Sequence, residues 1–157
     1  MSKSAAVLEA EGFHAYEVSN HARGDPARSR HNLVYWQGQD YVGAGPGAHG
    51  RITVGGVRQA THAAGRPADY IARVAAAGVG FTSREPLSPV EAAEERLLSG
   101  LRVTEGLPRA DVAALAISPD KIAGLIELGL LADDPDRLRT TPRGRLVLDR
   151  LTTELAT

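Results

Sequence analysis

The spacing of apolar positions changes character near residue 88. Before that point they come in short runs separated by glycine, proline and polar stretches, and after it they recur at helical spacing. Alanine-rich and extended runs, with Gly55-Gly56 as a two-residue turn, predict the elements of the first part. These are a helix over 5–11, a strand over 13–18, a helical turn over 32–37, a short strand over 41–44, a hairpin over 51–61, a helix over 67–77 and a linker over 79–86.

A capping signal opens the second part of the chain. Ser88 precedes a proline, and Glu91 follows Ser88 by three residues, which is the pattern of a capping box at a helix start. The later patterns predict two further helices, a hairpin and a last helix whose inward face carries four apolar side chains. The elements are helices over 108–115 and 118–128, a hairpin over 130–140, and a helix from Thr141 with Val147, Leu148, Leu151 and Leu155 inward. This content is typical of a winged-helix-like α+β domain.

Composition limits the class of protein. The 157 residues are 43% hydrophobic and 24% charged, carry a net charge of −1 and include no cysteine. These values are ordinary for a globular protein and give no bulk attraction to nucleic acid or anionic lipid. Without cysteine the chain can form neither a disulfide nor a thiolate-ligated cluster. No apolar run reaches the roughly 20 residues of a membrane helix, and the N-terminus does not resemble a signal peptide, so a cytoplasmic location is expected.

Charge argues against DNA binding by the second part. Residues 88–157 hold nine basic and twelve acidic side chains. The third helix, where a winged-helix DNA reader carries basic residues, offers Asp120, Lys121 and Glu127. We therefore predict a module for packing or for docking a partner.

Rare side chains gather between residues 30 and 50. The chain has seven aromatic residues, and Tyr35, Trp36 and Tyr41 lie here beside His31 and His49. Imidazole coordinates heme iron, and aromatic rings offer a flat apolar surface to a porphyrin. Equally, the rings could fill a seam between elements while His31 bonds to the backbone. The residues alone leave both interpretations open.

Three further features of this part of the chain give at most weak evidence for a binding site. The glycines that follow the aromatic residues could expose N–H groups to an anion, but the spacing is weak evidence because a hairpin rather than a long helix follows it. Glu17, on the strand over 13–18, is expected at a solvated end. The loop arginines Arg23, Arg28 and Arg30 are expected mostly in solvent.

Four motifs carry a resemblance to a known family. They are Y-E-V-S-N (16–20), H-N-L-V-Y-W (31–36), D-Y-V-G-A-G-P-G-A-H-G (40–50) and G-L-R-V-T-E-G-L (100–107). In this order they resemble the C-terminal half of radical SAM proteins, above all the HemW-type heme chaperones, which are often labelled oxygen-independent coproporphyrinogen III oxidase-like. The resemblance implies an α/β fold, with the terminal part of a partial (β/α) barrel and its extension in 1–85, followed by the family's winged-helix-like domain in 88–157.

The family's C-x-x-x-C-x-x-C motif is absent from this chain. The 4Fe-4S cluster and S-adenosylmethionine are implied for the complete protein, so the chain is expected to be a fragment that cannot cleave S-adenosylmethionine by itself. Whether the complete protein is an enzyme is left open.

The resemblance also assigns sites. It implies heme binding by His31, Asn32, Tyr35 and Trp36, with Asn32 orienting the imidazole. It further implies an S-adenosylmethionine pocket near Gly43, Gly45 and Ala48. No catalytic residue and no metal other than heme iron are expected in this chain. The implied partners are heme and recipient respiratory hemoproteins, and the chain could dimerise.

Two alternatives remain beside the heme chaperone. One is an oxygen-independent coproporphyrinogen III oxidase of porphyrin biosynthesis. The other is a non-catalytic structural fragment that binds nothing.

Overall fold

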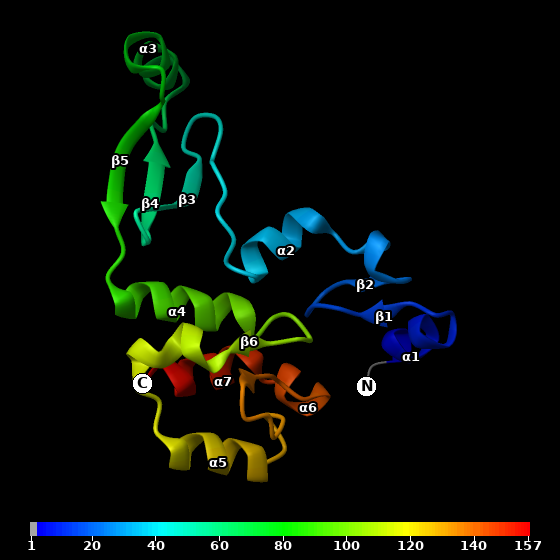
Figure 1. The fold of residues 1–157 in the computed structure, drawn as a ribbon. Coiled ribbons are helices and arrows are strands. Elements are labelled where there is room, and N and C mark those ends of the chain that lie inside the picture. Colours follow the sequence, from blue (N-terminus) through cyan, green and yellow to red (C-terminus); the bar gives the residue numbers. More distant parts are fainter. Residues whose placement is uncertain (1–2) are drawn as a thin grey trace. The chain divides into compact units, whose positions relative to one another are not determined.

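The fold is mixed α/β and consists of two compact units. A computed structural model describes residues 3–157, drawn as a ribbon in Figure 1. One unit combines residues 1–38 with 93–157, and the other comprises residues 39–92. The first unit therefore contains both the N-terminal segment and the C-terminal helices. The domain boundary near residues 85–88, which the resemblance implies, stays a prediction.

The N-terminal segment of the first unit consists of short elements. They are α1 (Lys3–Ala10), β1 (His14–Ala15), β2 (His21–Ala22), the 3-10 turn η1 (Asp25–Ala27) and α2 (Arg30–Trp36). The predicted first helix and the helical turn at 32–37 are both present, α2 beginning two residues earlier. Only two residues of the predicted strand pair with β2, because the next residues bond to the C-terminal part of the unit.

The C-terminal part of the first unit is mainly helical. Its elements are α4 (Pro89–Gly100), β6 (Leu107–Pro108), the 3-10 helix η2 (Arg109–Leu115), α5 (Pro119–Glu127), β7 (Arg137–Leu138), α6 (Pro142–Arg145) and α7 (Leu148–Ala156). The predicted capping box is formed, since Ser88 N–H donates to Glu91 Oε2 at 2.8 Å and Glu91 N–H donates to Ser88 Oγ at 3.2 Å.

A leucine-rich core holds these helices together. Most of its buried members come from α4, β6, η2, α5, β7 and α7, and Leu101 and Leu131 lie in the segments between these elements. The members are Leu97, Leu101, Leu107, Val112, Leu125, Leu131, Leu138, Leu148, Leu151 and Leu155. At Gly106, where φ is +63°, a Cβ would lie 2.1 Å from the carbonyl oxygen of Leu138. Only glycine allows the chain to turn this closely into the β6–β7 pair.

The last predicted helix and hairpin differ from expectation. The helix is divided into α6 and α7, with Leu146 and Val147 between them. Val147 is 43% exposed, so its predicted inward position is wrong, whereas Leu148 is buried as predicted. The hairpin over 130–140 reduces to a bridge between Leu131 and Thr140, because β7 pairs instead with β6.

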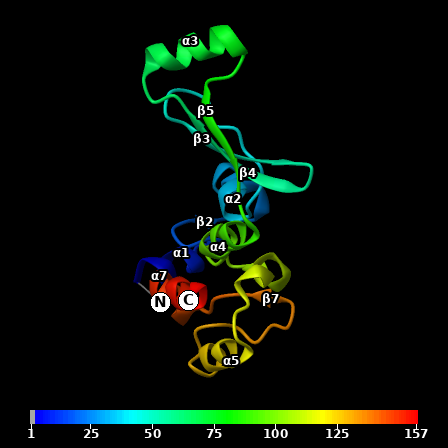
Figure 2. The ribbon, with the colours of Figure 1, turned by 90° about the vertical axis from the view of Figure 1, so that its left-hand side faces the viewer.

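The second unit is an antiparallel sheet with one helix. Strands β3 (His49–Val54), β4 (Val57–Ala63) and β5 (Phe81–Pro86) pair in the order β3-β4-β5, and α3 (Pro67–Ala77) connects the last two beyond one end of the sheet (Figure 1, Figure 2). The predicted hairpin and helix are confirmed. The predicted linker over 79–86 is wrong, because most of it is strand β5. No helix within residues 3–157 has the length and apolarity needed to span a membrane.

We predict that Leu97→Ala lowers the free energy of unfolding by about 2–5 kcal/mol, because the fully buried side chain would leave a cavity among the core leucines. The neighbouring Leu98 is 53% exposed and serves as the matched control, for which Leu98→Ala should cost less than about 0.5 kcal/mol. Urea unfolding of both variants measures the difference. Equal losses would contradict this account of the core.

Candidate functional site

Helix α2 carries the predicted heme-binding residues and begins at a well-defined cap. The Ser29 side chain accepts a hydrogen bond from the backbone N–H of Asn32 at 3.3 Å, which is the usual N-cap bond. The backbone N–H of Ser29 in turn donates to Tyr16 Oη at 3.1 Å. The start of α2 is therefore held by Tyr16, which is 3% exposed.

Tyr16 is itself bound to the loop after α4. Its backbone carbonyl accepts hydrogen bonds from the N–H of Thr104 at 3.0 Å and from Thr104 Oγ1 at 3.2 Å. The next residue, Glu17, forms an antiparallel bridge with Val103. The motif around Tyr16 thus joins the motif around Thr104, although 88 residues separate them.

Glu17 does not lie at a solvated end. Its exposed fraction is 2%, and its carboxylate accepts a hydrogen bond from the side-chain amide of Asn20. The expectation of a solvated carboxylate is wrong because the bridge to Val103 draws this part of the strand into the interior. A buried carboxylate requires such a polar partner.

Arg28 provides a second connection beside the cap of α2. Its guanidinium lies over the ring of Tyr16, 5.6 Å from the centroid, and donates to Glu105 Oε1 at 2.5 Å. Partial burial raises the pKa of the Glu105 carboxyl, but hydrogen bonds from Arg28, from the backbone and from Thr104, with the charge of Arg28, outweigh it and lower the pKa below the ordinary 4.5. The expectation that this loop arginine is solvated is therefore wrong.

The C-terminal end of α2 is held through Trp36. Arg96 Nη1 donates to the Trp36 carbonyl at 3.0 Å, and its Nε donates to Asp111 at 3.0 Å. Arg102 lies over the Trp36 ring, with Cζ 5.1 Å from the centroid. Trp36 is half-buried, and its Nε1 is buried without a hydrogen-bond partner among residues 3–157. The ring therefore has a packing role, which the alternative interpretation of the aromatic cluster anticipated.

His31 and Tyr35 form an exposed pair on α2. They lie four residues apart, and so on one face of the helix. The ring centroids are 5.0 Å apart with an interplanar angle of 73°, and Tyr35 Oη lies 3.3 Å from His31 Nε2. The imidazole is exposed to solvent. It is therefore accessible to a ligand and is not sequestered by a backbone bond.

The backbone of Asn32 has a structural role at the start of α2. Its backbone N–H completes the cap of α2, as described above, and the structure gives no contact between its side chain and His31 among the described residues. Its predicted role of orienting the imidazole stays a prediction.

The glycine-rich segment lies in the second unit. The N–H groups of three residues donate within the chain: Gly45 to Tyr70 Oη at 3.2 Å, Gly47 to the Ala64 carbonyl at 2.9 Å, and Ala48 to the Gly45 carbonyl at 3.3 Å. These donors are already used, so they do not form a cradle for an anion.

Gly43 allows a close approach of backbone to backbone. A Cβ on Gly43 would lie 2.3 Å from the His49 carbonyl oxygen, so the residue must be glycine for the loop to pack beside β3. Close packing against β3 thus gives a structural reason for the glycine at position 43. The assignment of Gly43, Gly45 and Ala48 to an S-adenosylmethionine pocket stays a prediction.

The sequence alone did not single out Tyr16, Arg96 or Arg102, which hold α2 in place. Tyr16 and Arg102 do fall inside two of the motifs that carried the resemblance. It also missed the stacking of His49 on His62, whose ring centroids are 4.3 Å apart, because only the strand register makes them neighbours. No cluster of three or more potential metal-ligating side chains occurs among the described residues.

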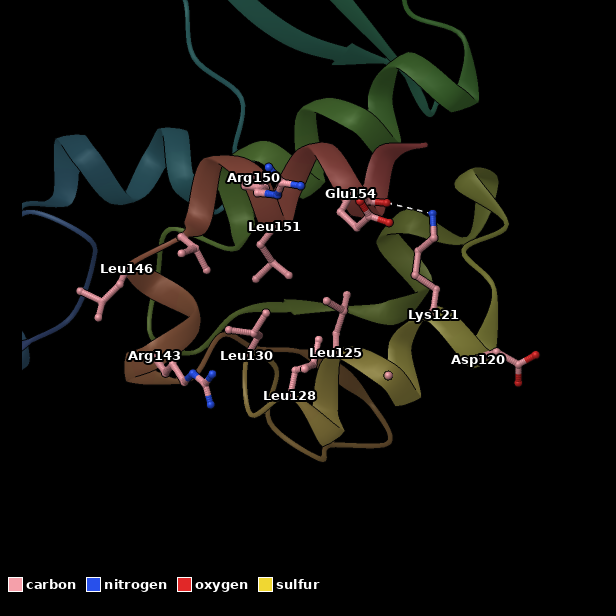
Figure 3. Close-up of a pocket in the computed structure, with 12 residues that line it drawn as sticks. Asp120, Lys121, Leu125, Leu128, Leu130, Arg143, Leu146, Arg150, Leu151 and Glu154 are labelled. Carbon is pink, nitrogen blue, oxygen red and sulfur yellow. Dashed lines mark hydrogen bonds between the residues drawn. The ribbon is translucent and has the colours of Figure 1, made fainter.

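The first unit also contains a large apolar cavity between α5 and α7, shown in Figure 3. Its volume is about 720 Å³, with Leu125, Leu128, Leu130 and Leu151 at its centre. None of the residues predicted to bind heme lines it.

Comparisons with known proteins agree with this architecture. Residues 87–147 match the model of the HemN C-terminal domain. The mitochondrial radical S-adenosyl methionine domain-containing protein 1 of Bos taurus is 39% identical over 159 residues, covering 93% of this chain and 36% of that protein. The heme chaperone HemW of Bacillus subtilis is 34% identical over 89% of this chain and 37% of its own length.

The solved structure of coproporphyrinogen III oxidase (HemN) from Escherichia coli, a radical SAM enzyme, matches with a TM-score of 0.65 over 99% of this chain and 39% of that chain. At 17% identity this likeness shows the fold alone. The chain spans little more than a third of these proteins.

We predict that Glu105→Gln lowers stability in a pH-dependent way. A lowered pKa in the folded state means that the ionised carboxylate stabilises the fold above pH 4.5, and that this contribution disappears as the pH falls below that value. The partly exposed pair should contribute no more than about 1 kcal/mol. Urea unfolding should therefore show a difference between native sequence and variant at about pH 7 that becomes smaller at about pH 3. A difference of the same size at both pH values would contradict the pairing with Arg28.

Proposed function

We propose that this chain, which belongs to the HemN/HemW family of radical SAM proteins, binds heme through helix α2 as part of a heme chaperone. Heme is the cargo in this proposal, and respiratory hemoproteins are its recipients. The complete protein's use of S-adenosylmethionine and a 4Fe-4S cluster is part of the same proposal, although the chain itself has no cysteine to ligate a cluster.

The exposed imidazole of His31 is the observation that carries the proposal. A histidine that only packs or caps would be covered or bonded to backbone, whereas this ring is exposed and, among residues 3–157, its hydrogen-bonding neighbour is Tyr35. Exposed imidazole beside aromatic rings has the chemistry of an axial ligand with an apolar surface for the macrocycle.

The contact of Tyr35 with Nε2 bears on which imidazole nitrogen would be available to iron. In a neutral imidazole one ring nitrogen carries the proton and the other keeps its lone pair. If Nε2–H donates to Tyr35 Oη, Nδ1 retains the lone pair and is the atom that would coordinate iron. Tyr35 would then act as the outer partner that sets the tautomer of the ligand.

The contacts that fix α2, together with the single exposed imidazole, suit reversible binding of heme. The helix is fixed at its start through Ser29 and Tyr16 and at its end through Arg96, so His31 is presented from a rigid element. A single exposed imidazole leaves the opposite side of the iron open. A recipient hemoprotein could approach from that side and replace the ligand, as delivery requires.

The likeness to HemN does not favour the oxidase alternative. It is a likeness of fold, and fold does not define function. The relatives of higher identity include proteins named heme chaperone HemW, which supports the chaperone proposal.

We predict that the 157-residue chain gives a saturable shift of the heme Soret band, and that His31→Ala weakens heme binding at least about tenfold because the axial ligand is lost. His14→Ala is the matched control, since His14 is also exposed in the first unit but belongs to β1 and not to α2. Optical titration with ferric heme measures both variants.

A His31→Ala variant that binds heme with unchanged affinity and spectrum would overturn the proposal. Equal weakening by His14→Ala would show that the exposed histidines bind heme without specificity, which would overturn it as well.

A further inference from the structure

A small cavity with three arginines lies where α6 meets α7. Its volume is about 300 Å³, and its lining includes Arg102, Arg145, Arg150 and Asp149, with Val18 and Val147 as apolar members. All belong to the first unit, the same compact body that carries α2. The proposed iron ligand, His31, does not line this cavity.

The cavity has an excess of positive charge. Its one carboxylate, Asp149, is 97% exposed and lies 3.8 Å from Arg102, a loose pairing. Within residues 3–157, Arg145 and Arg150 have no ion-pair partner, and Arg145 Nη1 is buried with no hydrogen-bond partner. A buried guanidinium nitrogen without an acceptor is costly, and Arg145, which borders the cavity, would gain an acceptor if its side chain turned toward an anion there.

The N-terminus of α7 adds to this preference for an anion. Val147 precedes the helix and provides no side-chain cap, so the first N–H groups of α7 lack that acceptor. The positive end of the α7 dipole and the three guanidinium charges therefore both favour a bound anion.

Arg102 connects the cavity with the aromatic end of α2. The guanidinium that lines the cavity also lies over the Trp36 ring, 5.1 Å from the centroid. One side chain therefore borders both the arginine cavity and the C-terminal end of the helix that carries His31.

We infer that this arginine cavity binds the propionate carboxylates of the porphyrin whose iron His31 ligates, an inference that rests on the proposed function. Heme carries its two carboxylates along one edge of a flat apolar macrocycle, so a site for it needs cations beside an aromatic surface. Guanidinium groups match carboxylates through paired hydrogen bonds. Arg145 and Arg150 would bind the carboxylates, and Arg102 would sit between them and Trp36.

Iron-free protoporphyrin IX and its dimethyl ester test the arginines separately from His31. Neither contains iron, so coordination plays no part, and they differ only in the two carboxylates. Porphyrin fluorescence should show that the chain binds the free acid at least about tenfold more tightly than the ester, the effect of one charged hydrogen bond.

Arg145→Gln should abolish this preference by weakening only the free acid. Arg150 is exposed, so Arg150→Gln should reduce the preference without loss of stability. This second variant keeps the test decisive if the Arg145 variant fails to fold. Arg143→Gln is the matched control, because Arg143 lies on α6 but does not line this cavity, and it should leave the preference intact.

The outcomes distinguish the inference from the function on which it rests. Equal binding of acid and ester, or a preference that survives Arg145→Gln and Arg150→Gln, overturns the arginine site. If ferric heme binding still depends on His31, the proposed function stands without it. Protoporphyrin binding that depends on the arginines, with heme binding indifferent to His31, supports the arginine site and overturns the iron ligand. Absence of binding by every porphyrin overturns both.

Discussion

The backbone carbonyl of Tyr16 accepts two hydrogen bonds from Thr104, and this contact joins the segment that carries α2 to the helical part of the first unit. The same residue binds Ser29 through its hydroxyl, and its ring lies under the guanidinium of Arg28. Because Tyr16 is buried, these bonds are shielded from competing water. The position of His31 depends on them, since α2 itself contains no buried residue that would fix it by packing.

This contact explains physically why two motifs distant in sequence occur together. Successive residues of the later motif each contact the earlier segment: Arg102 lies over Trp36, Val103 bridges to Glu17, Thr104 binds Tyr16 and Glu105 pairs with Arg28. These consecutive residues lie mostly in turns, and each can contact the earlier segment only because this short stretch packs against it. The motifs are therefore complementary parts of one interface within the unit, and the proposed heme and propionate sites lie along it.

The sequence was informative where the signal is local. The capping box at Ser88, the hairpin around Gly55 and the helix over 67–77 depend on neighbours within a few residues, and all are present. It failed where distant segments decide the outcome: β5 forms because β4 offers it an edge, and Glu17 is buried because Val103 pairs with it. The residues of the candidate site were predictable from their chemistry and the resemblance. Their supports, Tyr16, Arg96 and Arg102, were not, because their roles arise from contacts across 60 or more residues.

The central claim is that His31 ligates heme iron from an exposed position on α2. Electron paramagnetic resonance of the ferric heme complex, prepared with ¹⁵N-labelled histidine, tests the bond itself. The account predicts hyperfine coupling from a labelled imidazole nitrogen in the native sequence and its loss in His31→Ala, with His14→Ala unchanged. A heme complex that shows no coupling to labelled histidine, or retains it in His31→Ala, would contradict the account.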